Sequence, residues 1–141
     1  MDERALGGCV AFADSELIAA FEDGRVTKEI FRHPDHIRLA LLYLRRSPDL
    51  ADAASAFRAA FRRFTVAQGV PHLYNETITW AYLILIAQRM RERPAADSFA
   101  FLRENPELAT HRTGLLARYY DLEEVTRSPQ AKELFLLPTP R

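Results

Sequence analysis

Residues 78–87 read ITWAYLILIA, and this stretch decides the fold. A helix drawn through it carries apolar side chains on every side, with Thr79 as its only small polar residue. Helices that are apolar all round are surrounded by other elements. The run is about half the length that a bilayer requires, and it turns polar from Gln88 onward. The stretch therefore predicts a buried central helix over residues 75–91.

The rest of the chain repeats its apolar residues with helical rather than strand periodicity. The strongest pattern covers residues 34–46, where Ile37, Ala40, Leu41 and Leu44 follow the spacing i, i+3, i+4, i+7. Further helices are expected over residues 15–23, 48–67, 97–104, 114–120 and 129–135. The sequence thus predicts an all-α fold, a single-domain helical bundle of about four main helices plus short C-terminal helices. Residues 1–14 form an N-terminal segment and residues 136–141 an irregular tail.

Composition excludes several classes of protein. The 141 residues include 19 basic and 19 acidic side chains, so the formal net charge is zero. No basic arm is available for non-specific nucleic-acid or membrane binding. The single cysteine, Cys9, cannot form an internal disulfide. The acidic start MDERALGG lacks the pattern of a signal peptide. We therefore expect a cytoplasmic protein without a nucleic-acid or membrane partner.

Histidine and glutamate side chains gather at the predicted starts of two helices. His33 and His36 are three residues apart, which places them roughly 5–6 Å from each other on a helix surface. His72 and Glu76 are four apart and begin the row that continues into the apolar stretch. We expect the first row to face inward, and the second as well if its helix begins near Pro71. We expect His33, His36 and Glu76 to meet at one end of the bundle.

One hypothesis for this set is a metal site. Two histidines and one carboxylate with open positions suit Fe(II) or a related divalent ion, and helical bundles commonly hold such sites. His33, His36 and Glu76 would be the ligands, and His72 could join them if its turn is helical. The ion would be Fe, Zn, Ni or Mn.

A metal-free hypothesis uses the same residues as an acid–base pair. His36 and Glu76 in a partly apolar pocket would have displaced pKa values and could move a proton. Tyr43 and Tyr74 could supply hydroxyl donors. The ligand or substrate would be a small organic molecule, and the reaction could be that of a lyase, isomerase, hydrolase or oxygenase. Each residue also has a structural interpretation, as a helix cap, a core histidine or a tyrosine with a hydrated tip.

Two other groups of polar residues are expected to be structural. His111 lies in the polar stretch ATHRTG and is predicted to be exposed. Arg58 and Arg62 share a helix face, which we interpret as a solvated face rather than an anion site.

An alternative function is that of a non-catalytic interaction or regulatory module with structural histidines. Its candidate surfaces are the phenylalanine-rich helix over residues 50–64 and the segment LFLLP at 134–138. A homodimer is compatible with either function.

Three motifs resemble those of a group of small bacterial all-helical proteins that has no established activity. They are FRHPDHIRLALLYLRR at 31–46, YNETITW at 74–80 and the RYY triplet at 118–120. The resemblance extends from about residue 17 to 137. It implies a role for His33, Asp35, His36, Arg38, Tyr43, Tyr74, Glu76, Thr77, Arg118 and Tyr120. Where the group has histidine before the glutamate, this chain has Asn75, which we expect to cap a helix instead.

Overall fold

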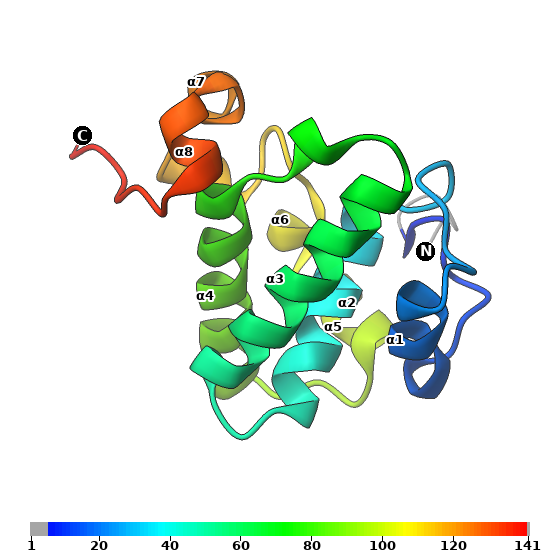
Figure 1. The fold of residues 1–141 in the computed structure, drawn as a ribbon. Coiled ribbons are helices and arrows are strands. Elements are labelled where there is room, and N and C mark those ends of the chain that lie inside the picture. Colours follow the sequence, from blue (N-terminus) through cyan, green and yellow to red (C-terminus); the bar gives the residue numbers. More distant parts are fainter. Residues whose placement is uncertain (1–5, 141) are drawn as a thin grey trace.

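The computed structural model describes residues 6–140, and all the regular elements within that range are helices (Figure 1). The long ones are α1 (Asp14–Glu22), α2 (His33–Arg46), α3 (Leu50–Ala67) and α4 (Glu76–Glu92). They pack as one bundle, which confirms the predicted all-α single-domain fold. Their bounds lie within two residues of the predicted ones.

Helix α2, rather than α4, is the central element. It packs against α1, α3, α4, α5 and α6. Leu39 and Leu41 point to different sides of α2, yet both are fully buried. Helix α4 carries the longest apolar run, but Trp80 and Ile84 on its surface are only half-buried. The helix with the longest apolar run is therefore not the most enclosed one.

Helix α3 supplies the aromatic part of the core. Asp49 caps its start by accepting a hydrogen bond from the Asp52 backbone N–H at 2.8 Å. Phe57, Phe61 and Phe64 repeat along one face and are all buried. This phenylalanine-rich face, predicted as a possible partner surface, is therefore occupied by the core of the protein itself.

The C-terminal part folds into short elements. These are α5 (Ser98–Glu104), α6 (Pro106–Ala109), a 3-10 turn at Leu115–Arg118, α7 (Leu122–Arg127) and α8 (Pro129–Glu133). Helices α6 and α7 were not predicted, because four and six residues are too few to show an apolar period. The predicted helix over 114–120 is only the 3-10 turn.

The Thr77 hydroxyl attaches the C-terminal segment to α4. Its oxygen lies 2.9 Å from the carbonyl oxygen of Ala131 and 2.7 Å from that of Leu134. It also accepts a hydrogen bond from the Leu136 N–H at 3.0 Å. One buried hydroxyl thus holds α8 and the chain after it against the bundle.

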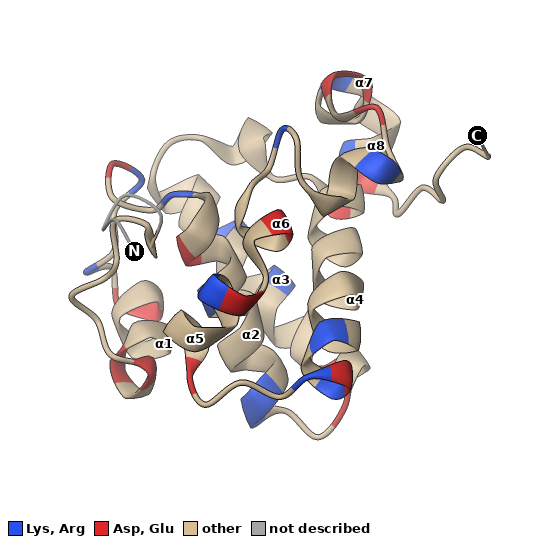
Figure 2. Cartoon of the chain, turned by 180° about the vertical axis from the view of Figure 1, so that it is seen from behind, with Lys and Arg blue, Asp and Glu red and all other residues tan. Residues whose placement is uncertain are grey.

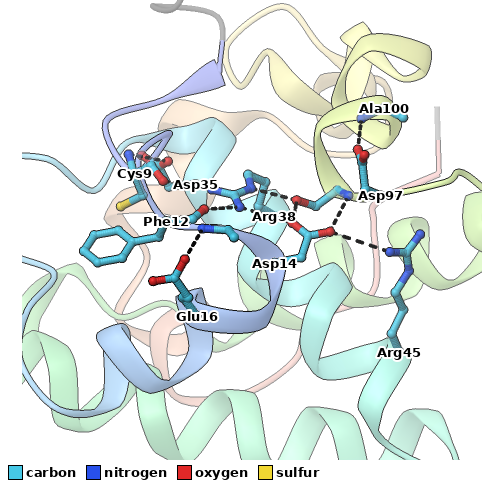
Figure 3. Close-up of polar contacts among 11 residues, drawn as sticks. Cys9, Phe12, Asp14, Glu16, Asp35, Arg38, Arg45, Asp97 and Ala100 are labelled. Atoms are coloured by element: carbon cyan, nitrogen blue, oxygen red, sulfur yellow. Dashed lines mark hydrogen bonds and ion pairs between the residues drawn. The ribbon is translucent and has the colours of Figure 1, made fainter.

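The buried guanidinium of Arg38 connects α2 to three other parts of the chain (Figure 3). It donates hydrogen bonds to the Ser98 hydroxyl at 2.7 Å, the Cys9 carbonyl at 3.0 Å and the Phe12 carbonyl at 2.8 Å. It also forms an ion pair with Asp14 at 3.2 Å. All these partners lie outside α2, so Arg38 joins the N-terminal segment, α1 and α5.

Asp35 holds the same N-terminal segment from the start of α2. Its carboxylate accepts hydrogen bonds from the backbone N–H groups of Gly8 at 2.8 Å, Cys9 at 2.9 Å and Arg32 at 2.8 Å. Gly8 packs so closely on the Ile30 backbone that a Cβ atom there would collide with its carbonyl oxygen. Residues 6–12 therefore follow a precise path across the bundle.

Charges of both signs are spread over the helices rather than collected on one face (Figure 2). Within residues 6–140, none of the helices combines the length and apolar character that crossing a bilayer requires.

Replacing Arg38 tests how much its contacts with the N-terminal segment, α1 and α5 stabilise the fold. Arg38→Met keeps much of the side-chain volume but removes the charge, and we expect the free energy of unfolding to fall by about 3 kcal/mol because buried partners lose their donors. Urea denaturation measures the loss. The control is Arg25→Met, which breaks the exposed ion pair with Asp23 and should barely move the denaturation midpoint. Equal losses in both variants would contradict this account.

Candidate functional site

A cavity of about 630 Å³ opens at the end of the bundle where α2 and α4 begin. This volume lies within the range of sites that hold small organic molecules. Residues from α2, α3 and α4 form its walls, and α7 and α8 contribute to its rim. The lining includes His33 and His36 from α2, Phe57 and Phe61 from α3, Tyr82 from α4, and His111.

His33, the first residue of α2, lies at the base of this cavity. Its Nε2 is 2.8 Å from the carbonyl oxygen of Leu108, and since a carbonyl can only accept, Nε2–H must be the donor. Burial lowers the pKa of His33 to about 4, despite the opposing effect of this hydrogen bond. The imidazole is therefore neutral at physiological pH, with a defined tautomer.

His36 lies between two phenylalanine rings. Its ring centroid is 4.2 Å from that of Phe31 and 4.9 Å from that of Phe61. Burial, reinforced by His33 and His111, lowers the pKa of His36 to about 3. Among residues 6–140 its ring nitrogens have no hydrogen-bond partner, and no enclosed side-chain nitrogen or oxygen in that range lacks one. The His36 nitrogens are therefore accessible to solvent, and His36 is one of the residues that line the cavity.

His111 completes the imidazole cluster, and the prediction that it is exposed was wrong. Its ring centroid lies 5.1 Å from that of His33, and its Nδ1 is hydrogen-bonded to the Tyr82 hydroxyl at 2.7 Å. Burial lowers the pKa of His111 and raises that of Tyr82, so both groups are neutral. The polar sequence around His111 could not show that this loop folds back over the start of α2.

Glu76 lies in a separate polar cluster. Its carboxylate accepts hydrogen bonds from Arg58 at 3.1 and 2.5 Å, from Tyr74 at 2.5 Å and from Trp80 at 3.2 Å. Arg62 adds a longer contact at 3.4 Å. Burial opposes ionisation, but the hydrogen bonds from Arg58 and Tyr74 outweigh it and hold the pKa of Glu76 below its usual value. Arg58 and Arg62 are therefore partners of this carboxylate, not merely a solvated face.

The structure thus divides the predicted site residues. His33 and His36 come together, with ring centroids 6.4 Å apart, and exposed His72 joins them at the cavity lining. Glu76 is not part of that lining, and Tyr74 faces Glu76 rather than a histidine. The hydroxyl of Tyr43 donates to Glu22 at 2.5 Å. The sequence pattern predicted two members of the cluster, His33 and His36, but not Tyr82 or His111.

The structure does not bring the proposed metal ligands together. In the part of the chain that the structure describes, no group of three or more His, Cys, Asp or Glu side chains could hold an ion. Binding of a divalent metal by His33, His36 and Glu76, with or without His72, stays a prediction.

Asn75 has the capping role expected from its sequence position. Its side-chain oxygen accepts from the Ile78 N–H at 3.0 Å, and its amide donates to the Val125 carbonyl at 2.9 Å. Both polar atoms are therefore engaged. Although Asn75 lines the cavity, it acts there by fixing the start of α4 and attaching α7.

Of the two surfaces expected for an interaction module, only the C-terminal segment is exposed. The phenylalanine-rich face of α3 is in the core, whereas in the C-terminal segment Leu134 and Leu137 are 56% and 79% exposed. A homodimer formed through this segment stays a prediction.

We expect Glu76→Gln to destabilise the protein by about 2 kcal/mol at pH 7, the usual value of hydrogen bonds to a charged group. Because the folded pKa of Glu76 is lowered, its contribution is complete above the unfolded value of about 4.3 and is lost as pH falls through the folded pKa. Urea denaturation across this pH range should show the two stability curves converging in acid. Glu123→Gln, at an exposed ion pair with Arg127, is the control with little effect.

Because of the histidine cluster, the free energy of unfolding should decrease as the pH is lowered from about 6.5. In this range the unfolded chain binds protons that the buried imidazoles do not. Replacing His36 with glutamine removes one such proton. As the pH falls through about 5, the free energy of unfolding should therefore decrease less steeply in His36→Gln than in the wild type. The two slopes should differ by about 1.4 kcal/mol per pH unit. NMR titration of the ring nitrogens checks the assignment directly: a His36 pKa near 6.5 would refute the neutral cluster.

Comparison of the chain with protein-family models, with curated proteins and with solved structures finds no match. The resemblance to the group of small bacterial helical proteins therefore stays a prediction. Any function proposed for the cavity must be argued from its own residues.

Proposed function

We propose that the protein binds a small, mainly apolar organic molecule in the cavity at the start of α2 and α4. The observation that carries this proposal is that His36 lines the cavity while its accessible ring nitrogens have no protein partner among residues 6–140. A ligand with a hydroxyl or N–H group would supply the missing hydrogen bond.

The walls of the cavity suit a flat apolar body. Phe57 and Phe61 lie on one side with parallel rings, their planes inclined by 6° and their centroids 5.8 Å apart. Ile37, Ile78 and Tyr82 also contribute to the lining. Burying an aromatic or branched ligand among these side chains would be favourable at roughly 25 cal/mol for each Å² of apolar surface removed from water.

Binding fits these residues better than proton transfer does. A general base works best when its pKa lies near the working pH. The pKa values of His33 and His36 are about 4 and 3, so both are weak bases but good neutral acceptors of hydrogen bonds. Glu76, the expected acid–base partner, is held by Arg58 and is not part of the cavity lining. The inferred role is therefore recognition of a ligand.

Two isoleucines on α4 allow a matched test. Ile78 lines the cavity, whereas Ile84 lines a different hollow, and both are half-buried. Titration with benzyl alcohol, followed by NMR of labelled histidines, should shift the His36 signals in the wild type and in Ile84→Trp. In Ile78→Trp the larger indole takes up space in the cavity, and the affinity should fall at least about ten-fold. Unchanged binding in Ile78→Trp, or wild-type shifts that avoid His36, would overturn the proposal.

A further inference from the structure

We infer that the ligand is a small organic anion, an apolar molecule that carries a carboxylate, and that Lys132 at the rim of the cavity recognises its charge. This inference rests on the proposed binding function and adds the class of ligand. It depends on the distribution of charge around the cavity.

The lining of the cavity has formal charges of one sign only. Lys132 and Arg127 are its two charged residues, and no aspartate or glutamate is among the lining residues that the structure describes. This bias is local, because the chain as a whole has equal numbers of acidic and basic residues. It has only two lysines, and one of them is at this rim. A charge pattern of this kind disfavours cations and attracts anions.

The carboxylates near the starts of α2 and α4 are engaged by other groups. Asp35 binds backbone N–H groups of the N-terminal segment, and Glu76 is paired with Arg58. Glu123 pairs with Arg127 at 2.9 Å, in an exposed contact that reduces the pull of Arg127 on a ligand. Lys132 has no ion-pair partner among residues 6–140 and is half-buried, so its charge is the one available to a bound anion.

The same geometry sets the orientation of the ligand. The neutral imidazole of His36 has one N–H donor and one lone pair, so it can bind a hydroxyl or amine group but carries no charge to attract a carboxylate, whereas Lys132 does. The carboxylate of the ligand should therefore lie at the rim beside Lys132. Its apolar body would pack between Phe61 and Ile78, with any hydroxyl or N–H group directed toward His36.

Three aromatic probes of similar size but different charge separate the possibilities: benzoate, benzyl alcohol and benzylamine. We expect benzoate to bind most tightly and benzylamine least, as measured by NMR titration of the His36 signals. The preference for benzoate should decline as salt is raised, because screening acts over about 8 Å at 0.15 M ionic strength.

The variant that tests the recognition is Lys132→Gln. Benzoate should bind it about five-fold more weakly, the effect of roughly 1 kcal/mol, while benzyl alcohol should bind as it does to the wild type. The matched control is Lys28→Gln, at the other lysine, which is exposed and outside the cavity, and it should leave both affinities unchanged.

The outcomes distinguish this inference from the function on which it rests. If benzyl alcohol and benzoate bind alike, and Lys132→Gln changes neither, the cavity binds small molecules but the anion inference is wrong. If none of the three probes shifts the His36 signals, the proposed binding function fails and the anion inference fails with it.

Discussion

The burial of a charge in the middle of the central helix is the constraint on which the rest of the structure depends. Arg38 is fully buried on α2, and an uncompensated guanidinium there would cost several kcal/mol. Its partners therefore have to be in place: the Ser98 hydroxyl at the start of α5, backbone carbonyls of the N-terminal segment, and Asp14 at the start of α1. Asp35, one turn earlier, fixes the same segment, so α2 organises both its own neighbours and the first residues of the fold.

The candidate site uses the beginning of the same helix in a different way. Here the buried groups are imidazoles, which avoid the cost of burial by losing their charge rather than by pairing. Because α2 is held from its middle by Arg38 and from its start by Asp35, His33 and His36 have defined positions. The polar groups of these histidines are neutral. Charge enters only at the rim, through α7 and α8.

Much of the fold was predictable because apolar periodicity reports the face that a helix buries. The four long helices followed from it, and so did the proximity of His33 and His36, since residues three apart are neighbours on a helix. The partner of Glu76 did not follow. Its position showed only that the side chain turns inward, and whether it would meet His36 or Arg58 depended on how α3 and α4 pack. His111 was missed because its local sequence is polar, whereas its burial comes from contacts with His33 and Tyr82.

The sequence by itself determined the all-helical fold, the bounds of the four long helices, the cap at Asn75 and the two histidines on one face of α2, because these depend on residues close together in the chain. Only the tertiary structure decided that α2 is the central helix, that Glu76 is neutralised by Arg58, and that His111 and Lys132 border the cavity. These features bring together residues that are far apart in the chain: Arg58 and Glu76 are separated by 18 positions, and His33 and His111 by 78. Such pairings are set by the packing of whole helices, for which no local pattern provides a signal.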